Sequence, residues 1–216
     1  MSNTAAVIFD LDGTLVDSLP GIESSSRSAI GRLLPEELMP DLRALIGPPI
    51  AEMLARVWPD LDPEKMAQLV AAFRAHYAEK GCLESLPYPG VIETLCRLQD
   101  AGLRMFVLTN KPAAPTKTIL GALGMAGFFA GVLAPDSPEA PFASKPDGAR
   151  LLMRRFGLDA GQTTLIGDGA DDAAAAEACG LRFIAAGYGY GAAAETAAIR
   201  VEKFSDIEGY LLSVPA

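Results

Sequence analysis

The sequence predicts an α/β fold in which a Rossmann-like, doubly wound, mainly parallel sheet carries a small all-α cap domain. Two observations lead to this prediction. Short apolar runs typical of buried parallel strands recur along the chain, and the later ones alternate with helix-like stretches. Between the first apolar run and the second lies a long segment of purely helical pattern, which we interpret as an insertion.

The expected strands and core helices alternate along the chain. The strands are Ala6–Phe9, Arg104–Leu108, Gly131–Ala134, Thr164–Ile166 and Arg182–Ala185. The helices, bounded by Pro, Gly or a capping residue such as Ser144, are Val91–Asp100, Thr116–Leu123, Pro146–Phe156 and Asp171–Cys179. In such folds the ligand site lies at the carboxyl ends of the strands.

The inserted segment, residues 17–84, is the expected cap, and residues 1–16 and 85–216 are the expected core. One cap helix begins at Asp62-Pro63, where five residues share a face: Met66, Leu69, Val70, Phe73 and Tyr77. The cap also holds four arginines that are candidates for a carboxylate or second phosphate of a substrate: Arg27, Arg32, Arg43 and Arg74.

Composition excludes several classes of protein. The 216 residues are 50% hydrophobic and 21% charged, which is typical of a globular chain and not of a disordered one. A net charge of −9 opposes binding to nucleic acid. The opening residues lack a basic region, so we expect no secretory signal, and the three cysteines form no C-x-x-C pair. We therefore expect a cytoplasmic protein. The sequence does not distinguish a monomer from a homodimer.

One uncharged segment, Ile119–Pro135, could be mistaken for a membrane span. It is shorter than such spans usually are, and four glycines interrupt it. We interpret it as a helix end, a turn and a buried strand, and expect no membrane partner.

Four aspartates lie where expected strands end: Asp10 and Asp12 in FDLDGT, Asp168 and Asp172 in IGDGADD. A carboxylate there is costly to desolvate unless a cation meets it. With only oxygen ligands nearby, the pattern favours a hard cation such as Mg²⁺. The alternative is that Asp12-Gly13 is an ordinary turn and that Asp171 and Asp172 cap a helix. The four together favour the metal.

Asp10 and Asp12 are two residues apart and therefore project toward the same place. This arrangement suits a division of labour in phosphoryl transfer. Asp10 would attack phosphorus and form an aspartyl phosphate, while Asp12 would give a proton to the leaving oxygen and later take one from water. Gly13 would let the chain turn after the pair and is also a candidate for phosphate binding.

A transferring phosphoryl group also needs donors and positive charge. Thr109 and Asn110, at the end of MFVLTN, supply a hydroxyl and an amide, and Lys145 in SKP supplies the charge. The alternatives are an ordinary turn at residues 109–112 and a solvated surface lysine. The apolar strand before Thr109 and the helix start fixed by Pro146 favour the functional interpretation.

FDLDGTLVDS, LTNK, SKP and GDGADD, in this order and spacing, resemble the four motifs of haloacid dehalogenase superfamily phosphatases. FDLDGTLVDSLPGI, YPGVIETLCRLQDAGLRMFVLTNKP, SKPDGARLL and GLRFIAAGYGYG look like the phosphoglycolate phosphatase branch, which has a helical cap after the first motif.

The resemblance implies a haloacid dehalogenase-like core, Asp10 as nucleophile and Asp12 as acid and base. It implies Mg²⁺ held by Asp10, the main-chain carbonyl of Asp12, and Asp168, with Asp172 close by or acting through water. Thr109 and Lys145 would bind the phosphoryl group. The chain departs from many relatives at Gly169, where they have serine, and Asp171 is an extra, outer carboxylate.

The expected function is therefore Mg²⁺-dependent hydrolysis of a small phosphorylated metabolite, with phosphoglycolate first by resemblance. Pyrophosphate, a nucleoside monophosphate or a sugar phosphate are alternative substrates, and a sugar phosphomutase is an alternative activity. The string Gly187–Ala192 passes a loose dinucleotide-binding pattern, which would indicate a non-catalytic nucleotide-binding module. Its late place in the chain and its bulky tyrosines argue against that module.

Overall fold

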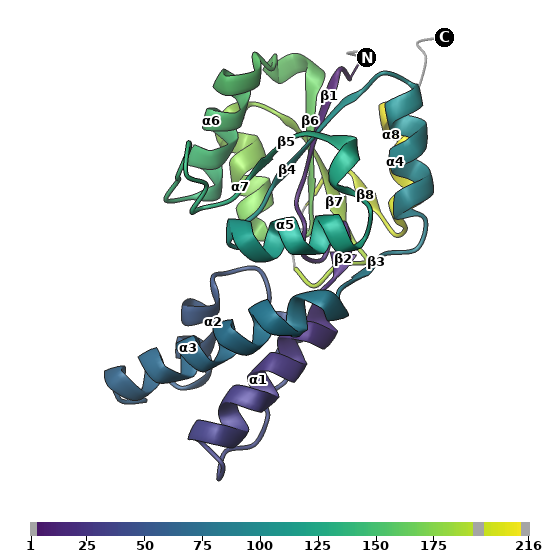
Figure 1. Cartoon of the computed structure of the whole chain (residues 1–216). Helices are drawn as coiled ribbons and strands as arrows, with labels where there is room; N and C mark the ends of the chain where they lie inside the picture. Colours follow the sequence, from purple (N-terminus) through teal and green to yellow (C-terminus); the bar gives the residue numbers. More distant parts are fainter. Residues whose placement is uncertain (1–3, 192–196, 213–216) are drawn as a thin grey trace.

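Six parallel strands form one sheet in the order β5-β4-β1-β6-β7-β8 (Figure 1). The computed structural model describes residues 4–191 and 197–212. Ala192, the end of the glycine and tyrosine string, lies outside them. The strands are β1 (Ala6–Phe9), β4 (Arg104–Leu108), β5 (Phe129–Leu133), β6 (Thr163–Gly167), β7 (Arg182–Ala186) and β8 (Arg200–Val201). The predicted α/β class with a mainly parallel sheet is confirmed.

Helices cover both faces of this sheet because alternate strand residues point to opposite sides. In β1, Val7 and Phe9 belong to the cluster that packs under α4 (Val91–Asp100), α5 (Ala113–Ala122) and α8 (Glu208–Leu211). Ala6 and Ile8 belong to the cluster under α6 (Lys145–Phe156) and α7 (Ala170–Cys179). The short helices of the core are η3 (Ala126–Phe128), η4 (Ala160–Gln162) and η6 (Phe204–Ile207).

A group of helices, called the cap below, projects from the carboxyl ends of the strands (Figure 1). It consists of α1 (Leu19–Leu33), η1 (Arg43–Leu45), α2 (Ile50–Val57), α3 (Pro63–Glu79) and η2 (Gly81–Glu84). The chain enters it through β2 (Val16–Asp17) and leaves through β3 (Leu86–Pro87), which pair antiparallel and are called the hinge ribbon. The domain boundaries at residues 17 and 84 stay a prediction.

The segment Ile119–Pro135 contains the end of α5, then η3, then β5. Our expectation of a buried strand there is wrong, since β5 is an edge strand and Val132 is 41% exposed. α5 begins three residues before the expected start, and Pro115 is accepted because the first turn of a helix needs no donor from it. Among the described helices, none has both the length and the apolar run that a membrane span requires.

Three strands were not predicted: β2, β3 and β8. Each has two residues, which is too short to show an alternating pattern. β8 pairs with β7 at the edge of the main sheet, and β2 and β3 form the hinge ribbon. Short pairings of this kind depend on what the rest of the chain brings beside them, so the local sequence carries no signal for them.

We predict that Asp62→Ala destabilises the cap. The Asp62 carboxylate accepts hydrogen bonds from the main-chain nitrogens of Glu64 at 3.0 Å and Lys65 at 3.1 Å, at the start of α3. Loss of such a cap costs about 1 kcal/mol. Denaturant unfolding measures the free energy of unfolding of Asp62→Ala and of a control variant, Asp60→Ala, which changes a nearby exposed aspartate. Equal stability of the two variants would contradict the prediction.

Candidate active site

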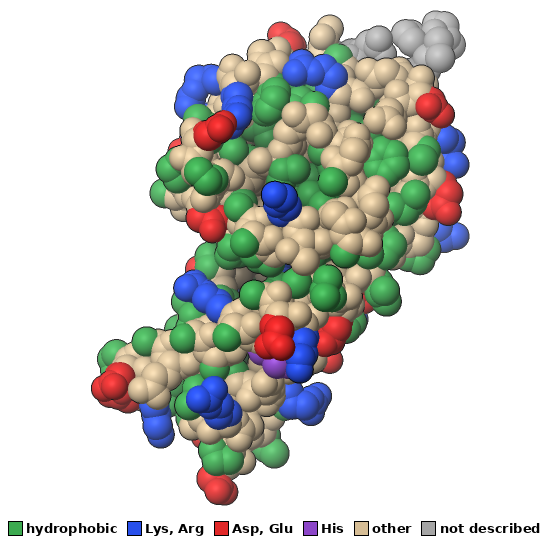
Figure 2. All heavy atoms as spheres, in the orientation of Figure 1, with side chains coloured by type: hydrophobic (Ala, Val, Ile, Leu, Met, Phe, Trp, Pro, Cys, Tyr) green, Lys and Arg blue, Asp and Glu red, His purple; other side chains and the backbone are tan. Residues whose placement is uncertain are grey.

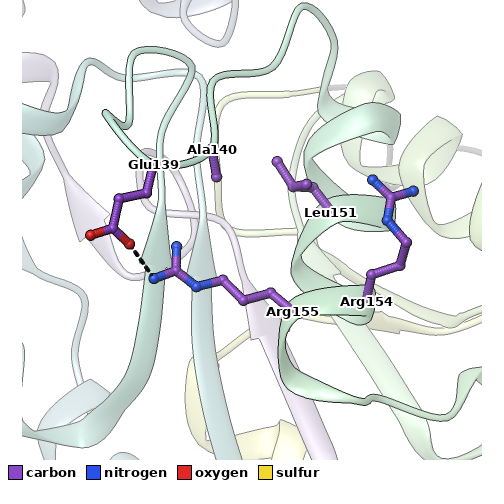
Figure 3. Close-up of a pocket in the computed structure, with 5 residues that line it drawn as sticks. All are labelled: Glu139, Ala140, Leu151, Arg154 and Arg155. Atoms are coloured by element: carbon purple, nitrogen blue, oxygen red, sulfur yellow. Dashed lines mark hydrogen bonds and ion pairs between the residues drawn. The ribbon is translucent and has the colours of Figure 1, made fainter.

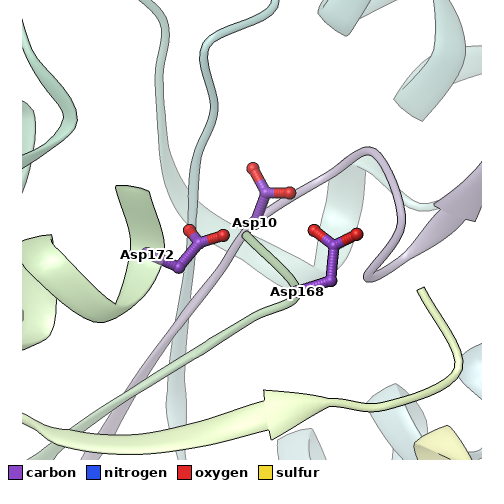
Figure 4. Close-up of side chains that lie close together, drawn as sticks. All are labelled: Asp10, Asp168 and Asp172. Atoms are coloured by element: carbon purple, nitrogen blue, oxygen red, sulfur yellow. The ribbon is translucent and has the colours of Figure 1, made fainter. Parts of the chain in front are cut away.

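Three buried carboxylates meet at the carboxyl ends of β1 and β6. Asp10 follows β1, Asp168 follows β6 and Asp172 lies in the first turn of α7. One carboxylate oxygen of each lies within 4.8 Å of the others, and Figure 4 shows the three side chains turned toward one another. They meet because β1 and β6 are parallel neighbours whose ends share one edge of the sheet.

Lys145 stands among these carboxylates and is only 5% exposed. Its Nζ lies 2.6 Å from Asp10 Oδ1 and 2.7 Å from Asp172 Oδ1. The preceding Ser144 caps α6 by accepting a hydrogen bond from the Asp147 main-chain nitrogen at 3.3 Å, which fixes where the helix and Lys145 begin. The alternative of a solvated surface lysine is therefore wrong.

Burial is the largest single influence on the pKa values of the three carboxyl groups and of Lys145. It raises the pKa of Asp10 to about 7, although the Lys145 ammonium acts in the opposite direction. Burial and the charge of Asp10 raise the pKa of Asp168 to about 6, and burial also raises the pKa of Asp172. For Lys145, burial alone would lower the pKa, but the charges of Asp10 and Asp172 and the hydrogen bonds to them together outweigh burial and raise the pKa.

This group of side chains fits a divalent cation. When ionised, three carboxylates beside one ammonium leave two negative charges without compensation, which equals the charge of one such cation. The ligand atoms that the three aspartates offer are all oxygens, as hard cations prefer. Buried carboxylates that repel one another also have the most to gain from a cation.

Gly13 allows the chain after β1 to pass against Asp168. A Cβ atom at Gly13 would lie 2.1 Å from Asp168 Oδ2, and the backbone has a φ of +82°, which favours glycine. The turn that we weighed as an alternative is present, with the Thr14 main-chain nitrogen donating to the Leu11 carbonyl at 3.3 Å across Asp12-Gly13. The turn and the close approach to the Asp168 carboxylate thus depend on the same glycine, Gly13.

The helix-capping alternative for Asp172 is also partly right. Asp172 Oδ2 accepts a hydrogen bond from the Gly169 main-chain nitrogen at 3.0 Å and caps α7, while Oδ1 faces Lys145. Asp171, by contrast, is exposed and lies outside the group of three carboxylates. The structure therefore separates the two adjacent aspartates into an inner and an outer residue.

Asp12 lies apart from the three carboxylates and pairs with a lysine that sequence reasoning missed. Lys111 Nζ lies 3.1 Å from Asp12 Oδ2 and donates to the Tyr77 hydroxyl of α3 at 2.7 Å. Burial alone would lower the pKa of Lys111, but the charges of Asp12 and Tyr77 and the hydrogen bonds to them together outweigh burial and raise the pKa. Asp12 Oδ1 is buried without a hydrogen-bond partner among the described residues. Lys111 is the last residue of the LTNK motif, and this motif was the signal in the sequence that could have identified it.

Thr109 and Asn110 lie at the end of β4, beside this pair. Thr109 is buried, and its hydroxyl accepts a hydrogen bond from the Lys111 main-chain nitrogen at 3.1 Å, a local contact that agrees with the turn we weighed as an alternative. Asn110 Nδ2 donates to Asp171 Oδ2 at 3.1 Å and to the Gly47 carbonyl at 3.4 Å. In this structure the Asn110 amide therefore connects the core to the cap.

A cleft of about 580 Å³ opens between core and cap beside Asp12. Asn110 and Lys111 line it from the core, and the apolar Ile50 and Phe73 line it from the cap. Figure 2 shows the waist between the two lobes, with hydrophobic side chains on both sides of it. Of the four cap arginines, Arg74 lines the cleft.

A second hollow, of about 490 Å³, lies on the core and contains none of the predicted site residues (Figure 3). Its lining is Glu139, Ala140, Leu151, Arg154 and Arg155. Arg155 pairs with Glu139 at 2.6 Å, and both side chains are largely exposed. The cleft beside Asp12 is the candidate active site because two predicted site residues, Asp12 and Asn110, line it. The buried residues Asp10, Asp168, Asp172 and Lys145 are outside its lining.

Comparison with known proteins identifies the family of the chain. The family model of haloacid dehalogenase-like hydrolases matches residues 4–180. A phosphoglycolate phosphatase of Rhodospirillum rubrum is 34% identical over 200 residues, covering 86% of this chain and 80% of that protein. The "Probable phosphatase IndB" of Dickeya dadantii is 34% identical, covering 94% and 91%. A crystal structure of a "predicted phosphoglycolate phosphatase" from Haemophilus somnus has a TM-score of 0.85 at 28% identity, covering 97% and 99%.

We predict that Asp168 makes the metal-free protein less stable as pH rises. Because burial raises the pKa of Asp168 from 3.8 to about 6, the folded state holds more protons than the unfolded state between those values. Its contribution to the free energy of unfolding therefore falls with rising pH across that range. Denaturant unfolding of the wild type and Asp168→Asn, in chelator, at several pH values measures this contribution as the difference between the two.

A divalent cation should reverse this trend, because it binds the ionised carboxylates of the folded state. With Mg²⁺ present, the wild type should gain stability over Asp168→Asn as pH rises. A metal-free wild type whose stability relative to Asp168→Asn increases with pH would contradict the prediction.

Proposed function

The chain belongs to the haloacid dehalogenase-like hydrolase family, and on that premise we propose that it is a Mg²⁺-dependent phosphatase of small phosphomonoesters. The observation that carries the proposal is the convergence of Asp10, Asp168 and Asp172 on one buried lysine, with Asp12 beside the cleft. No other group of described residues combines buried carboxylates within reach of one cation.

Asp10 is the proposed nucleophile. One of its carboxylate oxygens attacks phosphorus, the bond from phosphorus to the ester oxygen breaks, and an aspartyl phosphate forms. Asp12 gives its proton to the leaving oxygen and then takes one from the water that attacks the aspartyl phosphate. Phosphate leaves, and Asp10 is restored. Asp12 suits this role because it lines the cleft in which the leaving group would lie.

Lys145 and Thr109 are the proposed phosphate-binding groups, with Asn110 and Gly13 as further candidates. Lys145 is held charged by its neighbouring carboxylates and can offer positive charge to the equatorial oxygens. Thr109 is buried at the end of β4 and can supply its hydroxyl. The present contacts of Asn110 with Asp171 and Gly47 must open before its amide reaches phosphate.

Mg²⁺ is the proposed cation, held by Asp10, the main-chain carbonyl of Asp12, and Asp168, with Asp172 close by. It would neutralise charge on the transferring phosphoryl group. The buried oxygen ligands and the two uncompensated negative charges support this assignment.

Phosphoglycolate is the proposed substrate, because several relatives carry the name phosphoglycolate phosphatase. Arg74 lines the cleft and is the cap arginine placed to receive a carboxylate of such a substrate. We also propose that the enzyme acts in the cytoplasm, where thiols stay reduced. Its three cysteines, Cys82, Cys96 and Cys179, are free, as that compartment requires.

We predict that Asp10→Asn abolishes phosphatase activity, because an amide is not a nucleophile toward phosphorus. A loss of about 10⁴-fold in kcat is expected, and chelation of divalent metal should have a comparable effect on the wild type. Release of phosphate from a panel of small phosphomonoesters, with Mg²⁺ or chelator, measures both. Asp60→Asn is the control for an exposed aspartate. Turnover that survives chelation or Asp10→Asn would overturn the mechanism.

Arg74→Ala should raise KM for phosphoglycolate by about tenfold to a hundredfold, the loss expected for one charged hydrogen bond. Ethyl phosphate has a similar size and no carboxylate, so its KM should change little. Arg27→Ala, which removes an exposed cap arginine that does not line the cleft, is the matched control. An equal KM for phosphoglycolate in wild type and Arg74→Ala would exclude this role.

A further inference from the structure

The loop after β7, residues 187–191, has no part in the proposed chemistry, yet its backbone holds Asp168. The main-chain nitrogens of Tyr190 and Gly191 donate to Asp168 Oδ2 at 2.7 Å and 2.9 Å. The loop that matched a dinucleotide-binding pattern therefore binds a carboxylate of its own chain. The pattern and the contact share one cause, because backbone nitrogens in a glycine-rich loop are free to meet an anion.

This loop has almost no room to move against Asp168. A Cβ atom at Gly189 would lie 2.3 Å from the Gly13 carbonyl oxygen and 2.5 Å from Asp168 Cβ. One at Gly191 would lie 2.3 Å from the Asp168 carbonyl oxygen. Such distances are below any real Cβ contact, so only glycine allows this packing. A displacement of the loop therefore also displaces Asp168.

The side chain of Tyr190 extends from this loop to the start of the cap. Its hydroxyl donates to Asp17 Oδ1 and accepts hydrogen bonds from the main-chain nitrogens of Ser18 at 2.8 Å and Leu19 at 3.1 Å. These nitrogens open α1, where a helix has no internal acceptors to offer. Ser18 makes no side-chain capping bond. The Leu19 nitrogen also donates to Asp17 Oδ1 at 3.1 Å, so the Tyr190 hydroxyl and Asp17 together supply the acceptors at the start of α1.

A second contact joins Tyr190 to the cap. The guanidinium of Arg43, in η1, lies over the Tyr190 ring at 5.5 Å from its centroid. Asp17 belongs to β2, one strand of the hinge ribbon. Tyr190 thus contacts the hinge ribbon, the start of α1 and η1 through its side chain, and Asp168 through its backbone.

We propose that Tyr190 is a positioning residue that links the orientation of the cap to the carboxylate of Asp168. The proposal rests on the proposed function, because it takes Asp168 as a metal ligand. A rotation of the cap about the hinge ribbon displaces the acceptor and donors around the Tyr190 hydroxyl, and the tightly packed loop passes that displacement to Asp168. Linkage is reciprocal, so a cation bound at Asp168 restrains the start of α1.

Hydrogen exchange of the Ser18 and Leu19 amides tests this link directly. In the wild type, Mg²⁺ alone, without substrate, should slow their exchange by about tenfold, because the restrained loop opens less often. Tyr190→Phe keeps the ring and the backbone bonds to Asp168 but removes the hydroxyl. In that variant, Mg²⁺ should leave the exchange of both amides unchanged.

Tyr188→Phe is the matched control. Its hydroxyl comes from the same loop but donates to the Thr14 carbonyl of the core at 2.9 Å, not to the cap. This variant should retain the effect of Mg²⁺ on Ser18 and Leu19. Calorimetric titration adds a second readout, in which Tyr190→Phe should bind Mg²⁺ about fivefold more weakly than Tyr188→Phe does.

The outcomes separate this proposal from the proposed function. If the wild type binds Mg²⁺ but Tyr190→Phe keeps both the Mg²⁺ affinity and the Mg²⁺-dependent protection, the link is absent and Tyr190 has only a structural role. If the wild type binds no Mg²⁺, the proposed function fails and this proposal with it. A lower melting temperature of Tyr190→Phe with normal Mg²⁺ responses counts against the link.

Discussion

The burial of three carboxylates around one ammonium is the constraint on which the structure depends. Asp10, Asp168 and Asp172 repel one another when ionised, and Lys145, which pairs with Asp10 and Asp172, offsets part of that repulsion. Their backbone positions follow from two parallel neighbouring strands, and Lys145 is placed by the capped start of α6. The sheet supplies the rigidity that holds like charges at a separation they would otherwise avoid.

The loops around these charged side chains contact them in different ways. Gly13, Gly189 and Gly191 pack against Asp168, and none of them has a side chain at the contact. Lys111 instead joins Asp12 to Tyr77 of the cap, and Asn110 reaches the cap at Gly47. The cap is therefore bound to the core through the same residues that surround the carboxylates. Any movement of the cap that admits a substrate must rearrange some of these contacts.

Several interpretations that we weighed as alternatives turn out to coexist. Asp172 caps α7 with one oxygen and faces Lys145 with the other. Thr109 closes a turn and remains buried at the end of β4. A short polar side chain can satisfy the local backbone and still project a second atom into a site. Local capping signals therefore do not argue against a functional role.

The amino-acid sequence by itself determined the alternation of strands and helices, the place of the aspartates at strand ends and the oxygen ligands that they offer. These features are local, because the spacing of apolar residues over a short stretch of chain predicts its secondary structure and which side chains are buried. Lys145 was also found in this way, because Pro146 marks the start of its helix.

Only the tertiary structure decided the pairing of Lys111 with Asp12 and the contact of Tyr190 with the hinge ribbon. It also decided which of the cap arginines lines the cleft and placed the edge strand β5. Each of these joins residues far apart along the chain. No local pattern encodes such contacts, because they exist only when separate elements pack and exclude water between them.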